Sequence, residues 1–237
     1  MNELQKRTAQ GIVNLFETGH LMGDYGAVTL VAGDAGHLSY GRSQTSLASG
    51  GLYTLIDRYC KTEGATFGAN LTPFLERLRI ADVTLDHDQT LRDILKRAAA
   101  DPLMRQAQDQ FFDETYWTPA NHLALNACKA QPVVTCLGIA VIYDSVVHGN
   151  FTRIRAETNA AFPSDPAEKD WILRYLDLRR EWLAGNANPV LRKCVYRMDE
   201  LKKLAEAGKW ELELPLTVRG VPITEQSFVD QVLPDAA

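Results

Sequence analysis

The 237-residue sequence has no apolar run long enough to span a membrane and no block of basic residues. A membrane-spanning helix needs about 20 consecutive, mostly apolar residues, so we expect no membrane contact of that kind. The net charge is −5, and nucleic-acid binders instead carry clustered lysine and arginine. We therefore expect no nucleic acid as a partner. A mild acidic excess is compatible with a cationic polymer.

Cysteine and histidine are too scattered to form a metal site of known spacing. No CxxC pair is present, and the cysteines fall in apolar or helical stretches, which predicts buried free thiols at Cys60, Cys128, Cys136 and Cys194. A disulfide stays open as the alternative. The five histidines form neither an HExxH nor an HxH unit, and no GxSxG motif surrounds a serine nucleophile.

The N-terminal residues also lack the apolar core of a secretory signal peptide. Residues 1–7 instead open an amphipathic helix. The sequence leaves two localisations open. The protein is secreted or delivered outside the cytoplasm by a route without a signal peptide, or it is cytoplasmic if the sequence is complete and not exported.

Apolar periodicity predicts a mainly helical protein, and 237 residues suffice for one large domain or two lobes with a substantial core. A short strand is expected over 27–32, and a short strand or extended return over 210–223. The segment 132–148 is apolar around almost its whole circumference, which is typical of a central helix. The other expected helices are 4–18, 52–59, 74–80, 88–99, 103–116, 119–128, 168–183 and 190–207.

Two acidic residues suggest the chemistry of the protein. Asp34 lies among small residues in the glycine-rich stretch 32–41, where flexible backbone would leave its carboxylate open to a bulky substrate. Glu17 follows the apolar sequence 12–16, so we expect its carboxyl group to lie against hydrophobic side chains. One carboxyl in an apolar setting and one in a polar setting is the arrangement of a general acid and a general base in glycoside hydrolysis. The alternative is that both are solvated surface groups.

The glycine-rich stretch and its end hold further candidates. Ser39 could help to position a water molecule, and Tyr40 could stack on a sugar ring. His37 and Arg42 are candidate substrate contacts, although a solvated loop histidine is the simpler interpretation of His37.

Asp144 interrupts the predicted central helix. A buried carboxylate is costly unless it is paired, and arginine has the geometry to pair with it. The later helices offer four candidates, namely Arg179, Arg180, Arg192 and Arg197. We expect Asp144 to be buried and hydrogen-bonded to Arg179, with Arg192 or Arg197 completing the cluster near Glu17. Such a cluster could only join helices, or it could also hold a neighbouring catalytic acid in position.

With these residues in view, the sequence resembles the chitosanases of glycoside hydrolase family 46. Four stretches carry the resemblance in family order: Leu15-Phe16-Glu17 with GDAGHLSYG at 33–41, RQAQD at 105–109 with Tyr116 and Pro119-Ala120, YDSVVHG at 143–149, and YLDLR at 175–179. The resemblance implies a mainly α, lysozyme-like fold of two lobes, with a small β element lining the active-site cleft. It also implies a single glycoside hydrolase domain over 1–237, its lobes joined by long central helices.

The resemblance also implies roles for individual residues. Glu17 would be the general acid, Asp34 the general base, and Ser39 would stand in place of a threonine that helps to hold the water. Asp144 and Arg179 would belong to the charge network behind the acid, and the second arginine of that network would be Arg192 or Arg197. The implied reaction is endo-acting hydrolysis with inversion, without a metal or cofactor, by a monomer whose partner is a polysaccharide.

The chain departs from the family at one point. Chitosan-active members place an aspartate, which binds a glucosamine ammonium, near the start of the helix after the glycine loop. This sequence has Gly50-Gly51 there. Chitosan is therefore the first expected substrate, and the alternatives are peptidoglycan, cleaved by a lysin or delivered toxin, and a catalytically silent carbohydrate-binding relative.

Overall fold

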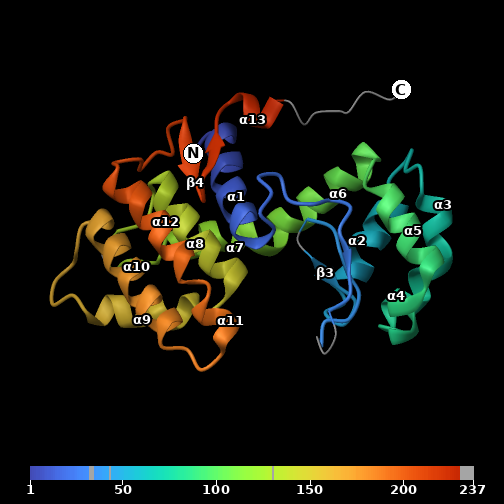
Figure 1. Cartoon of the computed structure of the whole chain (residues 1–237), viewed down its shortest axis with the longest axis horizontal. Helices are drawn as coiled ribbons and strands as arrows, with labels where there is room; N and C mark the ends of the chain where they lie inside the picture. The colour runs from blue at the N-terminus through green and yellow to red at the C-terminus, as the bar shows by residue number, and fades with distance from the viewer. Residues whose placement is uncertain (32–34, 43, 130, 230–237) are drawn as a thin grey trace. The chain divides into compact units, whose positions relative to one another are not determined.

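The computed structural model describes residues 1–31, 35–42, 44–129 and 131–229. The chain forms two compact units, one made of Met1–Leu21 and Tyr116–Ala237, the other of Met22–Thr115. Both units are mostly helical, and each contains a small antiparallel sheet (Figure 1). The predicted fold class, mainly α with a small β element, is confirmed. No helix within the described ranges is long and apolar enough to cross a membrane.

Helix α8 (Cys136–His148) is the central helix of the larger unit. Ten consecutive residues, from Cys136 to Ser145, are buried. The helices around it in this unit are α1 (Glu3–Glu17), α7 (Thr118–Ala124), α9 (Phe151–Ala160), α10 (Glu168–Ala184), α11 (Pro189–Arg192) and α12 (Val195–Glu206). All of these except α11 pack closely on α8 (Figure 1). The prediction of a central helix from its all-round apolar character is therefore confirmed.

The start of α8 differs from the prediction. The helix begins at Cys136 rather than at 132, because Thr135 caps it by accepting a hydrogen bond from the Gly138 N–H. Just before the cap, the Glu168 carboxylate accepts the backbone N–H groups of Val134 and Thr135. These bonds from α10 hold the preceding residues outside the helix.

Helix α9 of the larger unit was not predicted, because it buries only a narrow stripe, Phe151, Ile154 and Thr158, among polar residues. The segment 210–223, predicted as a short strand or extended return, contains the antiparallel pair β4 (Leu216–Val218) and β5 (Val221–Ile223), so extended structure is confirmed there. Helix α13 (Gln226–Val229) follows.

In the smaller unit, β1 (Val28–Thr29), β2 (Ser39–Tyr40) and β3 (Thr45–Ser46) form an antiparallel sheet in that order. The predicted strand over 27–32 is shorter, because β2 offers it only two partner residues. Residue 32 lies outside the described part. The helices of this unit are α2 (Gly51–Cys60), α3 (Gly68–Leu71), η1 (Thr72–Phe74), α4 (Leu75–Arg79), η2 (Val83–His87), α5 (Gln89–Ala98) and α6 (Pro102–Phe112).

The chain leaves the smaller unit through η3 (Asp113–Trp117), a π-helical turn that follows α6. The sequence had predicted one helix over 103–116.

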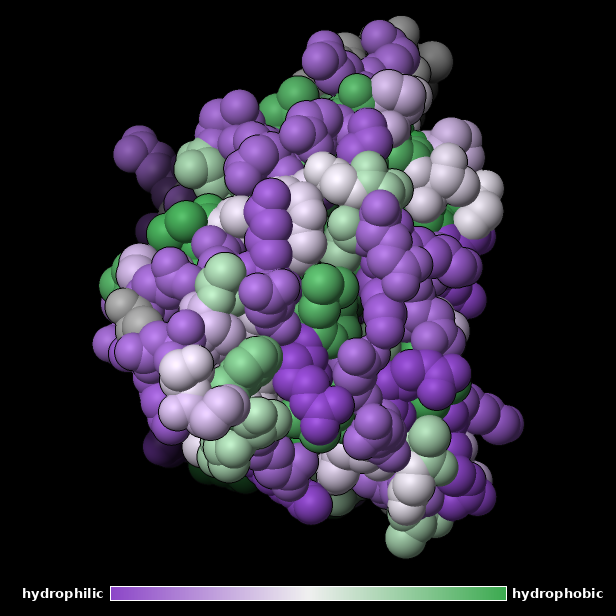
Figure 2. Space-filling view, turned by 90° about the vertical axis from the view of Figure 1, so that its left-hand side faces the viewer, coloured by the Kyte–Doolittle hydropathy of each residue, from purple (hydrophilic) through white to green (hydrophobic). Residues whose placement is uncertain are grey.

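All four cysteines lie in the described ranges as free thiols, as predicted, although only Cys128 and Cys136 are buried. The face seen in Figure 2 is mostly hydrophilic, with its apolar residues scattered.

Gly41 fixes how the sheet of the smaller unit meets α6. Its backbone has φ +78°, a conformation that favours glycine. A Cβ atom there would overlap the carboxamide of Gln108. That carboxamide is held at both ends: its Oε1 accepts the Arg42 N–H at 3.0 Å, and its Nε2 donates to the Tyr25 carbonyl at 3.0 Å. The Gln108 carboxamide therefore has little freedom to move away from an added Cβ atom.

We expect Gly41→Ala to destabilise the protein by more than the left-handed conformation alone explains. That conformation costs a non-glycine residue about 1–2 kcal/mol, and an overpacked methyl group adds about 1–3 kcal/mol. Gly50→Ala is the matched control, since Gly50 has φ +73° in the same unit and open space around its Cβ position. Urea denaturation would measure both free energies of unfolding. Equal losses for the two variants would contradict the packing argument.

Candidate active site

Glu17 is the last residue of α1, and 40% of its side chain is exposed. The sequence had placed it against hydrophobic side chains. The helix instead ends at this residue, so the carboxylate leaves the buried face that Thr8 to Phe16 form. It makes an ion pair with the guanidinium of Arg197, whose carbon lies 5.4 Å from the centre of the Phe16 ring. The carboxylate is therefore solvent-accessible and fixed from one side.

Arg197, on α12, joins Glu17 to a buried carboxylate. Its side chain is 2% exposed, and its Nε lies 3.1 Å from Oδ1 of Asp144, which is completely buried on α8. Burial by itself lowers the pKa of Arg197, but the carboxylates of Asp144 and Glu17 outweigh burial and raise it. The guanidinium is thus held between two carboxylates, one buried and one exposed.

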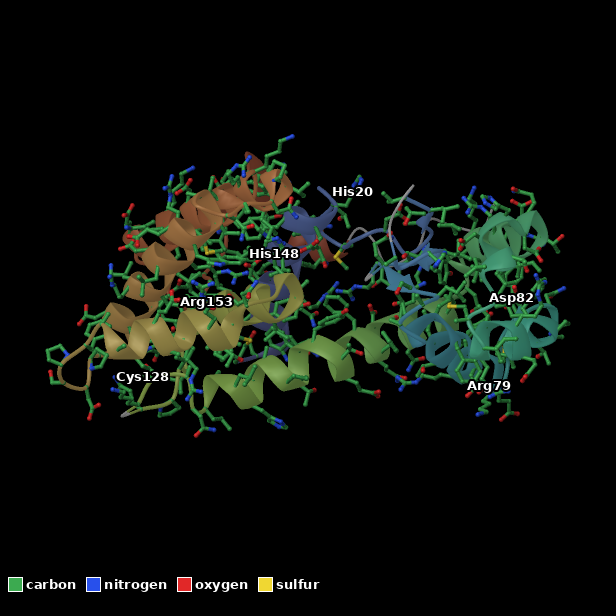
Figure 3. All side chains as sticks on the ribbon, turned by 90° about the horizontal axis from the view of Figure 1, so that it is seen from below. His20, Arg79, Asp82, Cys128, His148 and Arg153 are labelled. Atoms are coloured by element: carbon green, nitrogen blue, oxygen red, sulfur yellow. The ribbon has the colours of Figure 1, made fainter. Side chains whose placement is uncertain are left out.

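Arg179, on α10, is the second buried cation beside Asp144. Its Nη2 lies 4.0 Å from Asp144 Oδ2, an ion-pair distance, whereas the sequence had predicted a hydrogen bond between the two side chains. The guanidinium instead donates to the C-terminal end of α8. Its Nη1 donates to the Gly149 carbonyl at 2.8 Å, and its Nη2 donates to Nδ1 of His148 at 3.2 Å. His148, the last residue of α8, is labelled in Figure 3.

Arg197 and not Arg192 is the arginine of this cluster. Arg192 lies on the short helix α11, is exposed, and donates to the backbone carbonyls of Asn186 and Ala187. Those carbonyls precede the helix, so the side chain folds back on its own loop. This corrects the expectation that left both arginines open.

Sequence reasoning missed His148 and did not assign a role to Tyr116. His148 lies four residues after Asp144 on α8, a spacing that puts both side chains on one helix face and could have revealed it. Burial, Arg197 and Arg179 lower the pKa of His148 against the opposing pull of Asp144 and Glu17. Burial and the charge of Glu17 raise the pKa of Tyr116. Both side chains therefore lie close enough to Glu17 for its charge to affect their pKa values.

The candidates of the glycine-rich stretch belong to the smaller unit. Asp34 lies outside the described residues. Ser39 is buried on β2, and its Oγ donates to the His37 carbonyl at 3.4 Å. His37 has φ +60° and is held by Asp86, whose Oδ2 lies 2.8 Å from its Nδ1 and whose Oδ1 accepts the Leu38 N–H. Nothing in the sequence around Asp86 had distinguished it from other surface acids. With 37% of its side chain exposed, His37 remains a candidate contact.

The structure contradicts the expected sugar contacts of Tyr40 and Arg42. Tyr40 is completely buried in the core of the smaller unit, where burial raises the pKa of its hydroxyl, so its ring is closed to a sugar. Arg42 is also buried. It makes an ion pair with Asp109, and its guanidinium lies 4.8 Å from the centre of the Phe112 ring. Both side chains join the sheet to the rest of the smaller unit.

In the part of the chain that the structure describes, no group of His, Cys, Asp and Glu is placed to hold a metal ion.

Comparisons with known proteins identify the family and the fold that this chain resembles. The sequence model of Glycosyl hydrolase family 46 matches residues 11–216. A chitosanase of Bacillus subtilis (strain 168) is 30% identical over an alignment of 238 residues. The alignment covers 92% of this chain and 83% of that protein. Native chitosanase from Bacillus subtilis MY002 superimposes with a TM-score of 0.76 at 28% identity, covering 92% of this chain and 95% of that one.

A glutamate-to-alanine mutant of the MY002 chitosanase, complexed with 6 GlcN, superimposes with a TM-score of 0.75 at the same 28% identity and the same coverage, 92% and 95%. These likenesses confirm the predicted lysozyme-like fold class.

We expect Asp144→Ala to lower the free energy of unfolding by about 3–5 kcal/mol, because it leaves the buried guanidiniums of Arg179 and Arg197 without their shared carboxylate. The matched control is Asp199→Ala, which removes an exposed ion pair to Arg180. Exposed pairs contribute little, so the control should denature close to the wild type. Denaturation in urea measures both, and equal effects of the two variants would show that Asp144 does not stabilise the cluster.

Proposed function

Because this chain belongs to glycosyl hydrolase family 46, we propose that it cleaves the β-1,4 linkages of chitosan at internal positions with inversion at the anomeric carbon. The family makes the chain a glycoside hydrolase; the substrate, the mode of cleavage and the residue roles are the proposal. The observation that carries it is the position of Glu17. Its carboxylate is exposed at the end of a helix and is held by Arg197, which the buried Asp144 holds in turn.

In the proposed reaction Glu17 is the general acid. It gives its proton to the glycosidic oxygen as the bond from that oxygen to the anomeric carbon breaks. Glu17 is then a carboxylate, and the Arg197 guanidinium beside it stabilises the charge that the transfer creates. A cation that is already in place needs no reorganisation during the reaction. Asp144 supports this role by holding Arg197 from the buried side.

Asp34 is the proposed general base. It takes a proton from a water molecule that attacks the anomeric carbon from the face opposite the departing oxygen, with Ser39 helping to position that water. Inversion requires room for this water between the base and the anomeric carbon. Residues 1–237 act, in the same proposed reaction, as one catalytic domain of a monomer outside the cytoplasm.

Chitosan is the proposed substrate because the related proteins are chitosanases and one was crystallised with 6 GlcN. The net charge of −5 favours a polymer whose amines carry positive charge. Helix α2 begins at Gly51 with Gly50 as its N-cap, so these positions offer no acidic side chain to an ammonium group. The polymer must therefore be bound through other groups, of which His37 is one candidate.

We expect Glu17→Gln to lower the rate of reducing-end release from chitosan by about 10²–10⁴-fold, the usual contribution of a general acid. Its affinity for a glucosamine hexamer, measured by calorimetry, should stay near the wild-type value, because the amide keeps the shape of the side chain. The matched control is Glu181→Gln, an exposed glutamate of α10 in the same unit. Full activity of Glu17→Gln would contradict the acid assignment.

Two further outcomes test the rest of the proposal. Proton NMR of the first products should show the α-anomer, because inversion of a β linkage yields it, and a first product in the β form would exclude inversion. Peptidoglycan incubated in parallel should give no product. Cleavage of peptidoglycan without cleavage of chitosan would overturn the substrate, and binding of chitosan without any turnover would indicate a silent carbohydrate-binding relative.

A further inference from the structure

We propose that His148 is a positioning residue that, in its neutral form, holds Arg179 in place and through it the chain Asp144–Arg197–Glu17. Its effect on activity rests on the proposed function, whereas its protonation state can be tested without any substrate. The residues involved come from four helices of the larger unit, α8, α10, α12 and α1.

The contact between His148 and Arg179 fixes which nitrogen of the imidazole carries the proton. A guanidinium only donates hydrogen bonds, so Nδ1 of His148, 3.2 Å from Arg179 Nη2, must be the acceptor. The proton of the neutral ring is then on Nε2. A doubly protonated imidazole has no lone pair at Nδ1 and cannot accept this bond. The hydrogen bond therefore exists only while His148 is neutral.

The charges that face His148 favour the neutral form. Arg179 on α10 and Arg197 on α12 are cations, while Asp144 on α8 and Glu17 on α1 are anions that oppose them. Burial is the largest influence, and together with the two arginines it lowers the pKa of His148 below its usual 6.5. The C-terminal end of α8 carries only a partial negative charge of about 0.5, which is too small to offset burial and two full cations.

Protonation of His148 would change the partners of Arg179. The hydrogen bond to Nδ1 would be lost, and the two like charges would repel each other. Asp144 is the nearest carboxylate to which Arg179 could turn, since Oδ2 lies 4.0 Å from its Nη2. Asp144 would then form close ion pairs with both arginines instead of mainly with Arg197. Its attraction for Arg197 would weaken, and Arg197 would be held less firmly beside Glu17.

The lowered pKa of His148 also determines how the stability of the protein depends on pH. In the unfolded chain His148 takes up its proton near pH 6.5, and in the folded protein it does so only at a lower pH. Between the two values the unfolded state binds more protons, so its free energy falls relative to that of the folded state. Stability from this group is therefore complete above pH 6.5 and is lost as the pH falls through this window.

The test compares two substitutions of His148. In His148→Asn the amide oxygen can replace Nδ1 as an acceptor but does not titrate, whereas His148→Ala removes the acceptor. We expect His148→Ala to lower kcat on chitosan about tenfold at pH 7 with KM little changed, as for other residues that orient a functional group, and the difference from the wild type to shrink as the pH falls and the wild-type His148 is protonated. His148→Asn should restore kcat at pH 7 and move the acidic midpoint of its pH profile to lower pH by about half a unit or more.

His122→Asn is the matched control, because His122 is an exposed histidine on α7 of the same unit. It should leave kcat and the pH profile at their wild-type values. An acidic limb of His148→Asn identical to that of the wild type would overturn the proposal, as would full activity of His148→Ala.

A second measurement separates this proposal from the proposed function. Histidine NMR of the wild-type protein without substrate, with the His148 signal assigned from its absence in His148→Asn, should give a titration midpoint below 6.5 for His148. The melting temperature of the wild type should also fall more steeply below pH 6.5 than that of His148→Asn. A His148 midpoint above 6.5 would overturn the proposal whatever polymer the enzyme cleaves. A low midpoint in a protein inactive on chitosan would count against the proposed substrate alone.

Discussion

The ion pair between Asp144 and Arg197 is the constraint on which the arrangement of the larger unit depends. Helix α8 is buried almost all round, so a charge on it is tolerable only if other helices bring opposite charge to it. Helices α10 and α12 do so by placing Arg179 and Arg197 beside Asp144. The positions of three helices are thereby linked. Because Arg197 also pairs with Glu17, the end of α1 is tied to the same point.

Much of this fold could be predicted from the sequence, but its boundaries and its polar contacts could not. The all-round apolar character of 132–148 identified the central helix, because a helix that is apolar on every side must be surrounded by other elements. The start of that helix depended on Glu168, a residue from another helix that accepts two N–H groups before the cap. Helix α9 was missed because its apolar stripe is narrow. Such features are set by tertiary contacts that local periodicity does not encode.

In the candidate site, too, the sequence predicted some residues correctly, whereas others depend on tertiary contacts. The sequence identified Glu17 and Asp144 as unusual carboxyl groups, yet it could not choose between Arg192 and Arg197, which lie five positions apart on the consecutive helices α11 and α12. Only the packing of α12 on α8 separates them. For Tyr40 and Arg42, position in a glycine-rich stretch suggested exposure, whereas the sheet turns both side chains into the smaller unit. His37 and Asp86 are far apart in sequence, so no local pattern could have joined them.

The two hydrogen bonds of Gln108 place one side chain at both ends of a long segment. Its carboxamide, on α6, accepts the Arg42 N–H and donates to the Tyr25 carbonyl, so it fixes the two ends of the segment that contains the proposed base. Closing a loop costs entropy that grows only slowly with its length. The carboxamide therefore offsets part of that cost for the whole segment. A substitution of Gln108 would release both ends at once, although the residue lies on neither strand.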